Sequence, residues 1–501
     1  MNPLVSFLLK KRLQQIDLFR EHPRLAQLEV FHALVQTAKY TEWGRKYDYA
    51  SITHPDQLRQ RVPLQDYEDV KPFVERLRKG EQNLLWPTDM RWFAKSSGTT
   101  SDRSKFIPVS REALEDCHYK GGKDLIAFHY EQFPDSKLYQ GMSLVVGGSS
   151  NIEQFRPDAY TGDLSAIIIR NLPLWVEVRR TPVIETALLD NWEVKIEQMA
   201  RETMREDVRC IAGVPSWTLV LLRRILELSG KQNILEVWPN LELFMHGGVS
   251  FRPYRAQFEA LIPSPTMNYL ESYNASEGSF AIQDRRGADD MLLMLDYGIF
   301  YEFIPLDELD KEHPHTVLVH EVKVGQSYAI VISTNGGLWR YMPGDTVRFT
   351  SVQPYRVQVS GRTKSFINAF GEELVVENAD RGIEAACEAT GAVVSEYTAA
   401  PIYMESDARG GHEWVIEFET GPDDLSAFTA TLDRMMRSVN SDYDAKRRGD
   451  MALRPPVVHN VPPGTFYAWM KHRGKLGGQN KVPRLCNDRG ILEGLLAPVE
   501  S

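Results

Sequence analysis

The chain has 501 residues, of which 43% are apolar, so it is long enough to bury more than one hydrophobic core. It carries 58 lysine and arginine residues against 68 aspartate and glutamate residues, and this net charge of −10 disfavours a general nucleic-acid-binding protein. The four cysteines lack CxxC and Cys/His spacing, which argues against structural zinc and disulfides and predicts a reducing, cytoplasmic location; they are Cys117, Cys210, Cys387 and Cys486.

About the first 90 residues are predicted to be mainly helical, in segments separated by Pro63, Pro72 and Pro87. Apolar residues recur at helical spacing over residues 1–20, but the basic residues follow the apolar stretch and no small-residue cleavage site is present. We therefore expect an amphipathic helix packed on the body of the protein and no secretory signal. The longest apolar runs are too short to span a bilayer, so no membrane partner is expected.

Between residue 91 and about residue 350, short β-rich runs alternate with helical patterns, which favours an α/β fold of mixed sheets covered by helices. Strands are predicted at 143–146, 166–169, 241–244 and 328–333, and helices at 111–130, 194–205 and 217–228. After about residue 360 the pattern restarts in the order βαββαβ, which indicates a small C-terminal α+β domain of ferredoxin-like type. The predicted domains are residues 1–360 and 361–501.

Five small residues lie between two short stretches of strand character at 91–95 and 105–109; they are Ser96, Ser97, Gly98, Thr99 and Thr100. Hydroxyl groups, a glycine backbone and the nearby Lys105 offer donors, close approach and positive charge to a polyphosphate. The spacing is not that of a Walker-type loop, and a helix is expected only from Ser110. The run predicts a phosphate loop on a hairpin; taken alone, it also fits a polar turn between two strands.

Two later segments carry residues suited to a nucleotide. Tyr273 can present a ring face to a base, and Ser276 and Glu277 follow in a predicted turn, where a carboxylate can hold Mg²⁺ against phosphate oxygens. Farther along, a Pro-Gly turn directs Asp345 out of a strand end, and its carboxylate can accept hydrogen bonds from both ribose hydroxyls. Taken singly, each of these segments would more often have a purely structural role.

The order and spacing of the three segments resemble the nucleotide motifs of the adenylate-forming superfamily of acyl-CoA synthetases, luciferases and peptide-synthetase adenylation domains. They are more closely similar to the Gretchen Hagen auxin-responsive family of acyl-acid amido synthetases. Its pattern is Ser-Ser-Gly-Thr-Ser/Thr with a later Lys, then Tyr-x-x-Ser-Glu, then Tyr-x-x-Gly-Asp. Here these are residues 96–100 with Lys105, Tyr273 to Glu277, and Tyr341 to Asp345. The resemblance extends from residues 63–72, through a hinge-like segment at 361–372, to residues 465–485.

The resemblance implies two half-reactions, in which a carboxylic acid and ATP form an acyl-adenylate and pyrophosphate, and an amine then forms an amide and releases AMP. It implies ATP and Mg²⁺ as cofactors, with Glu277 as the metal ligand, and small-molecule partners: a carboxylic acid and an amine, in this family usually that of an amino acid. It also implies a mobile C-terminal domain that rotates between the half-reactions. The implied nucleotide-binding residues are Ser96, Ser97, Gly98, Thr99, Thr100, Tyr273, Ser276, Glu277, Tyr341, Asp345 and Arg362. The implied catalytic residues are Lys105 and two lysines of a basic C-terminal segment, Lys475 and Lys481.

By family position, residues 214–217 and 247–249 are candidates for the acyl-acid pocket, although core packing explains them equally well. Three positions depart from the pattern, Asp102, Met342 and Ser365, and none of them removes a group that the chemistry needs. Two other functions stay open: an acyl-CoA or carrier-protein ligase, and a degenerate nucleotide-binding protein that acts as an interaction module. The sequence names neither the acid nor the amine.

Overall fold

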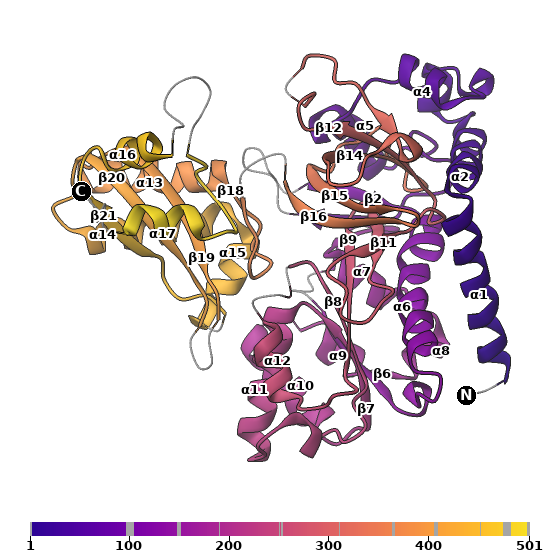
Figure 1. The fold of residues 1–501 in the computed structure, drawn as a ribbon, viewed down its shortest axis with the longest axis horizontal. Coiled ribbons are helices and arrows are strands. Elements are labelled where there is room, and N and C mark those ends of the chain that lie inside the picture. The colour runs from indigo at the N-terminus through magenta and orange to yellow at the C-terminus, as the bar shows by residue number, and fades with distance from the viewer. Residues whose placement is uncertain are drawn as a thin grey trace.

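The computed structural model describes most of the chain, namely residues 3–96, 105–147, 152–189, 191–249, 251, 254–309, 311–362, 366–404, 409–450, 452–473 and 482–497. A larger N-terminal part and a smaller C-terminal part lie side by side, at the right and the left of Figure 1. The protein thus has the predicted mixed α/β architecture, with a large N-terminal and a small C-terminal domain.

The first 80 or so residues are helical, as predicted. The helices are α1 (Pro3–Glu21), α2 (Pro23–Ala38), α3 (Glu42–Lys46), α4 (Pro55–Arg61) and α5 (Tyr67–Lys79), with a 3-10 turn at Tyr49–Ser51. Helix α1 buries Ile16 and Phe19 against the body, and Arg12 forms an ion pair of 2.6 Å with the fully buried carboxylate of Asp124. The expectation of a packed amphipathic helix at the N-terminus is therefore confirmed.

Two sheets organise the N-terminal domain. The smaller has the order β2-β1-β5-β4, with β1 (Trp92–Ser96), β2 (Lys105–Val109), β4 (Glu153–Arg156) and β5 (Ala159–Gly162). The larger has the order β13-β12-β14-β15-β16-β11-β10-β9-β8-β7-β3-β6. Its strands are β3 (Met142–Val146), β6 (Arg180–Thr181), β7 (Val208–Gly213), β8 (Leu243–Gly247), β9 (Asn268–Ala275), β10 (Gly278–Ile282), β11 (Met291–Leu293), β12 (Ile299–Pro305), β13 (Val317–Leu318), β14 (Ser327–Thr334), β15 (Asp345–Val352) and β16 (Tyr355–Arg362).

Helices cover these sheets, and they include the three that were predicted at 111–130, 194–205 and 217–228. They are a π-helical segment (Ala113–His118), α6 (Tyr119–Gln132), α7 (Leu164–Arg170), α8 (Leu174–Glu177), α9 (Ile184–Ala187), α10 (Trp192–Thr203), α11 (Pro215–Ser229) and α12 (Arg255–Leu261), with 3-10 turns at Leu138–Gln140, Ile234–Glu236 and Val319–Glu321. The strand predicted at 166–169 is wrong, because these residues form the middle of α7. Burial of Ala166, Ile167 and Ile169 on one face of the helix outweighs the β propensity of the isoleucine run.

The C-terminal domain contains a short hairpin and a three-stranded sheet. The hairpin is formed by β17 (Phe366–Ile367) and β18 (Leu374–Val375). The sheet has the order β19-β20-β21, with β19 (Val393–Ile402), β20 (Gly411–Thr420) and β21 (Val457–Val461). Its helices are α13 (Val376–Thr390), α14 (Leu425–Val439), α15 (Ser441–Arg447), α16 (Thr465–His472) and α17 (Gly490–Leu496), with a 3-10 turn at Arg448–Asp450. The predicted elements occur in the predicted order, but β18, α15, α16 and α17 are additional. The first strand pairs with β18 and does not join the sheet, because the chain turns back at Gly371, which has a φ of 83°.

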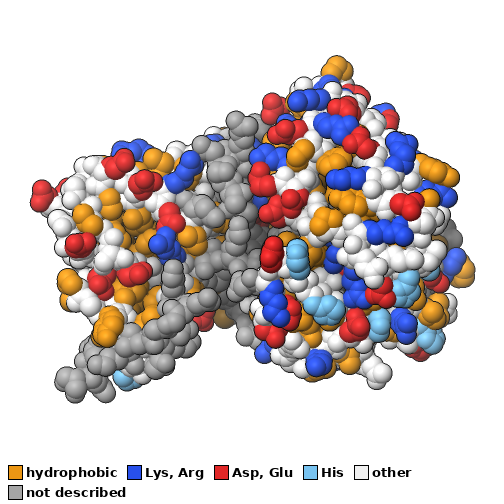
Figure 2. Space-filling model, turned by 90° about the horizontal axis from the view of Figure 1, so that it is seen from above, with side chains coloured by type: hydrophobic (Ala, Val, Ile, Leu, Met, Phe, Trp, Pro, Cys, Tyr) orange, Lys and Arg blue, Asp and Glu red, His pale blue; other side chains and the backbone are white. Residues whose placement is uncertain are grey.

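The face of the molecule shown in Figure 2 is mixed in charge. On the face shown in Figure 2, lysine and arginine side chains alternate with aspartate and glutamate side chains, without a large patch of one sign. Within the part of the chain that the structure describes, no helix combines the length and the apolar character needed to cross a bilayer.

Candidate active site

The predicted phosphate loop is carried by an antiparallel hairpin. Strands β1 and β2 pair from Trp92 opposite Val109 to Ser96 opposite Lys105, so the loop leaves and re-enters the sheet at neighbouring positions. Ser97, Gly98, Thr99 and Thr100 lie outside the described residues, as does the side chain of Ser96. The prediction that a hairpin frames this run is confirmed; its contact with phosphate stays a prediction.

The helical segment after β2 connects the first motif to the third. Ser110 begins this segment as predicted, because its hydroxyl accepts a hydrogen bond of 2.9 Å from the Ala113 amide. The same hydroxyl donates to the carbonyl of Asn335 at 2.7 Å, and the Asn335 side-chain amide donates to the carbonyl of Glu112 at 3.1 Å. Asn335 follows β14 and precedes the third motif by a few residues, so these bonds fix the two motifs relative to each other.

The same segment also meets the second motif. The backbone amide of Ser279 donates to the buried Cys117 sulfur at 3.1 Å, two residues beyond the turn that holds Glu277. Ser276 and Glu277 form a two-residue turn between β9 and β10, since Ala275 pairs with Gly278. The predicted turn is therefore present, and the helical segment after β2 contacts both the second motif and the segment that precedes the third.

The second and third motifs are joined directly by a hydrogen bond. The Tyr273 hydroxyl donates to Oδ2 of Asp345 at 2.7 Å, with both residues buried. Because the acceptor is a carboxylate, this bond is of the strong, charge-assisted kind and fixes how Asp345 is oriented. The tyrosine hydroxyl thus positions the carboxylate predicted to bind ribose, a role that the sequence alone did not suggest.

The remaining predicted site residues differ in where they lie relative to Tyr273 and Asp345. Asp345 begins β15 directly opposite Arg362, the last residue of β16, whose side chain lies outside the description. Tyr341 is fully buried and its backbone pairs with Ile332, so its position fits an anchor for the third motif better than a direct nucleotide contact. The ammonium of Lys105 lies 5.7 Å from the ring centroid of Tyr67. Lys475 and Lys481 lie outside the described residues, and their roles stay predictions.

The candidate acyl-acid segments lie at the same edge of the large sheet. The parallel strands β7, β8 and β9 end at Gly213, Gly247 and Ala275, and carboxyl ends of parallel strands share an edge, where ligands bind in open α/β sheets. Gly248 turns there with a φ of 81°, and a Cβ at this position would lie 3.6 Å from the Val214 side chain. Val214 and Gly248, one from each candidate segment, are thus neighbours, and a role of these segments in binding the acid stays a prediction.

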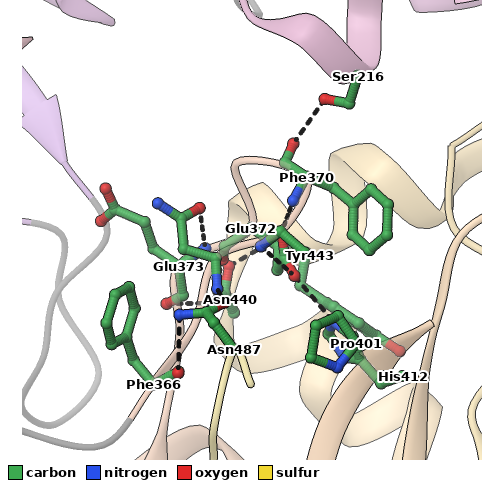
Figure 3. Close-up of polar contacts among 12 residues, drawn as sticks. Ser216, Phe366, Phe370, Glu372, Glu373, Pro401, His412, Asn440, Tyr443 and Asn487 are labelled. Atoms are coloured by element: carbon green, nitrogen blue, oxygen red, sulfur yellow. Dashed lines mark hydrogen bonds and ion pairs between the residues drawn. The ribbon is translucent and has the colours of Figure 1, made fainter. Parts of the chain in front are cut away.

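A turn of the C-terminal domain covers this edge (Figure 3). Ser216 donates a hydrogen bond to the carbonyl of Phe370 at 3.4 Å, and the Tyr254 hydroxyl donates to the carbonyl of Ala369 at 2.7 Å. Within the turn, the buried Glu372 carboxylate accepts a hydrogen bond of 2.6 Å from the backbone amide of Phe370. Its other oxygen lies 2.8 Å from Nε2 of His412. Hydrogen bonds therefore hold the turn between β17 and β18 together and dock it beside the candidate acyl segments.

The buried thiols and imidazoles next to this site are shifted toward their neutral forms. Burial raises the pKa of Cys117 to about 12, and burial with the nearby Arg255 lowers the pKa of His246 to about 3. His246 is buried, and neither of its ring nitrogens has a hydrogen-bond partner among the described residues. Such neutral groups agree with a chemistry that needs no covalent nucleophile.

A magnesium ion fits Glu277 only together with phosphate oxygens. The described residues contain no group of three or more His, Cys, Asp and Glu side chains arranged to hold a metal by themselves. Mg²⁺ in nucleotide sites needs only one or two carboxylates, with substrate phosphates and water completing its coordination. The lone carboxylate in the β9–β10 turn is consistent with such a site.

Two charged residues beside the site escaped the sequence analysis, Asp442 and Lys446 of α15. They belong to no motif and lie about 100 residues beyond the third motif, and only the docking of the two domains brings them to the site. A buried lysine four residues after an aspartate is a weak signal by itself, since such pairs are common on exposed helices.

Comparisons with known proteins agree with this geometry. Family models described as the GH3 family N-terminal, central and C-terminal domains match residues 12–267, 292–362 and 377–490. An Arabidopsis thaliana indole-3-acetic acid-amido synthetase, GH3.3, is 23% identical over 98% of this chain and 94% of its own length. The Arabidopsis 4-substituted benzoates-glutamate ligase GH3.12 is 23% identical over 87% of this chain and 88% of its own. A solved GH3.15 acyl acid amido synthetase shares the fold, with a TM-score of 0.61 and 17% identity over 98% of this chain and 96% of that one. The chain is a member of the GH3 family, as the three motifs predicted.

Proposed function

We propose that this protein is an acyl-acid amido synthetase, an ATP-dependent, AMP-forming ligase that joins a carboxylic acid to an amine. The observation that carries the proposal is the hydrogen bond between Tyr273 and Asp345. It joins the second and third motifs at the edge where the β9–β10 turn and the candidate acyl segments also lie. The names of the relatives, which describe amido synthetases and a benzoate-glutamate ligase, support the same reaction class.

In the first half-reaction a carboxylate oxygen bonds to the α-phosphorus of ATP, and pyrophosphate leaves. Two anions must approach each other, so the protein has to offset negative charge. The hydroxyls of residues 96–100, Lys105 and a Mg²⁺ ion on Glu277 are assigned to the phosphates, and Asp345 to the ribose hydroxyls. Lys481, or else Lys475, supplies a further cation from the C-terminal domain.

In the second half-reaction the amine nitrogen bonds to the acyl carbon and AMP leaves. The C-terminal domain, proposed to comprise residues 361–501, rotates between the two steps, and the docked turn of residues 368–373 is the part that meets the acyl segments in the orientation seen here. A small-molecule acid and amine, with ATP and Mg²⁺, are the proposed ligands, and the cytoplasm is the proposed location.

ATP–pyrophosphate exchange with a panel of aromatic and aliphatic carboxylic acids tests the first half-reaction. Amide formation is then measured with amino acids, and coenzyme A is offered in their place as a competing acceptor. We expect exchange with at least one acid and product only with the amino acids. Absence of exchange with every acid would refute adenylation, and thioester formation would identify an acyl-CoA ligase instead.

A further inference from the structure

The segment of residues 63–72 belongs to none of the three motifs, yet its backbone binds the third one. The amide of Gln65 donates to the carbonyl of Arg340 at 2.9 Å, and the amide of Met342 donates to the carbonyl of Gln65 at 2.9 Å. These two bonds form a short parallel bridge. Because Asp345 follows a few residues later, the bridge fixes the segment to the part of the chain that leads to the predicted ribose carboxylate.

Helix α5 begins directly after this bridge. The carboxylate of Asp66 caps the helix, because it accepts hydrogen bonds from the amides of Glu68 at 2.8 Å and Asp69 at 3.2 Å. The cap fixes the direction in which α5 leaves the bridge and makes Tyr67 its first residue. The side chain of Tyr67 is buried, so it packs into the body of the domain and not into solvent.

Tyr67 binds the strand that follows the predicted phosphate loop. Its hydroxyl accepts a hydrogen bond of 2.8 Å from the backbone amide of Phe106, the second residue of β2. Strand β2 is the outer strand of the small sheet, and amides on its open side have no partner strand. The tyrosine hydroxyl satisfies one of these amides and thereby holds β2 immediately after Lys105.

The side chains of the first two residues of β2 also contact α5. The ammonium of Lys105 lies 5.7 Å from the ring centroid of Tyr67, within the distance of about 6 Å over which a cation and an aromatic face attract each other. The guanidinium carbon of Arg78, near the end of α5, lies 3.7 Å from the ring centroid of Phe106 and 4.8 Å from that of Phe155 in β4. Helix α5 therefore contacts both the backbone and the side chains where the chain leaves the phosphate loop.

We infer that Tyr67 is a positioning residue for the first half-reaction, and that it holds Lys105 and the start of β2 in place relative to the third motif. Tyr67 touches no reacting atom and acts through Lys105, which is assigned to the phosphates of ATP. A lysine side chain is long and flexible, so a fixed backbone and a ring face beside the ammonium reduce its freedom before ATP binds. The inference rests on the proposed function, and it gives residues 63–72 the role of joining the phosphate loop to the third motif.

Two substitutions separate the hydroxyl of Tyr67 from its ring. Tyr67→Phe removes the acceptor for the Phe106 amide and keeps the ring face, whereas Tyr67→Leu removes both. The rate of ATP–pyrophosphate exchange should fall at least about fivefold in Tyr67→Phe, the lower end for a buried amide that loses its acceptor, and further in Tyr67→Leu. Aminolysis of supplied acyl-adenylate should change less than about twofold, because no pyrophosphate leaves in that step.

Tyr130→Phe is the matched control for the loss of a tyrosine hydroxyl. Tyr130 is also buried, and its hydroxyl accepts a hydrogen bond of 3.3 Å from the backbone amide of Tyr139. This bond precedes β3 and so lies at the amino ends of the parallel strands, away from the candidate site. The control should lower the Tm and leave both half-reactions near the wild-type rates. An exchange loss in Tyr67→Phe no larger than in the control, or equal losses in the two half-reactions, would overturn the inference.

A double-mutant cycle with Lys105→Met tests whether the tyrosine acts through the lysine. Once the ammonium is absent, loss of the ring should cost little more, so the combined loss in exchange rate should fall short of additivity by about threefold or more. Additive losses would refute the positioning role. If Tyr67→Leu fails to fold, Tyr67→Phe takes its place in the cycle, because the fixed amide also acts through Lys105. Wild-type protein without exchange for any acid would refute the proposed function, whereas wild-type exchange without a selective loss in the variants would refute this inference alone.

Discussion

The hydrogen bond between Tyr273 and Asp345 gives the sharpest test of the nucleotide site. Tyr273→Phe removes one charge-assisted bond of 2.7 Å and keeps the ring packed on Phe280, whose centroid lies 4.9 Å away. Bonds to charged acceptors contribute about 1.5–3 kcal/mol, so the variant should lose up to that much stability. If the freed carboxylate must be reoriented when ATP binds, the same cost lowers ATP affinity by about 10- to 150-fold at most.

The assay is a double-mutant cycle on the KM for ATP in pyrophosphate exchange, with Tyr273→Phe, Asp345→Ala and the double variant. Asp345→Ala should lose more than Tyr273→Phe, because it removes the ribose acceptor itself. The double variant should be no worse than Asp345→Ala, since the tyrosine acts only through the carboxylate. Tyr301→Phe is the matched control, a fully buried tyrosine whose hydroxyl only reaches the Phe280 carbonyl at 3.5 Å. Additive losses, or a Tyr273→Phe variant that behaves like the control, would refute the positioning role.

Three further predictions concern the metal, the C-terminal lysines and pH. Glu277→Gln should reduce pyrophosphate exchange and be partly restored by raised Mg²⁺, because the amide is a weaker metal ligand; normal exchange with impaired amide formation would contradict this. Lys481→Ala should slow adenylation about 10²- to 10³-fold, the usual loss for one preorganised donor, and leave aminolysis of supplied adenylate nearly unchanged. Lys475→Ala serves as the comparison in single-turnover measurements, and equal losses in both steps would reject the assignment. Asp442→Asn should raise the Tm at pH 8 and lose this advantage toward pH 4. The folded pKa of about 7 lies above the ordinary 3.8, so the stability gained by protonation is complete at low pH and lost as pH rises through 7; a Tm difference independent of pH would contradict this.

The sequence by itself determined the features that depend on local order. The run of hydroxyls and glycine between two short strands, the Ser276–Glu277 turn and the Pro-Gly turn before Asp345 are set by neighbouring residues, and their order along the chain identified the family. Helices were predicted correctly where apolar spacing and caps agreed, as at Ser110. The strand predicted at 166–169 failed for the opposite reason, since propensity pointed one way and burial of one helical face decided otherwise.

Only the tertiary structure decided which distant side chains meet. The Tyr273 hydroxyl bonds to a carboxylate 72 residues away. The turn that follows Ala369 docks on hydroxyls more than 100 residues earlier in the chain. Lys446 belongs to no motif, and it contacts the ring of Trp217 only because α15 faces α11 across the domain junction. A hydrogen bond or a buried charge depends on distances of a few ångströms between elements, and the spacing of residues along a chain does not contain those distances.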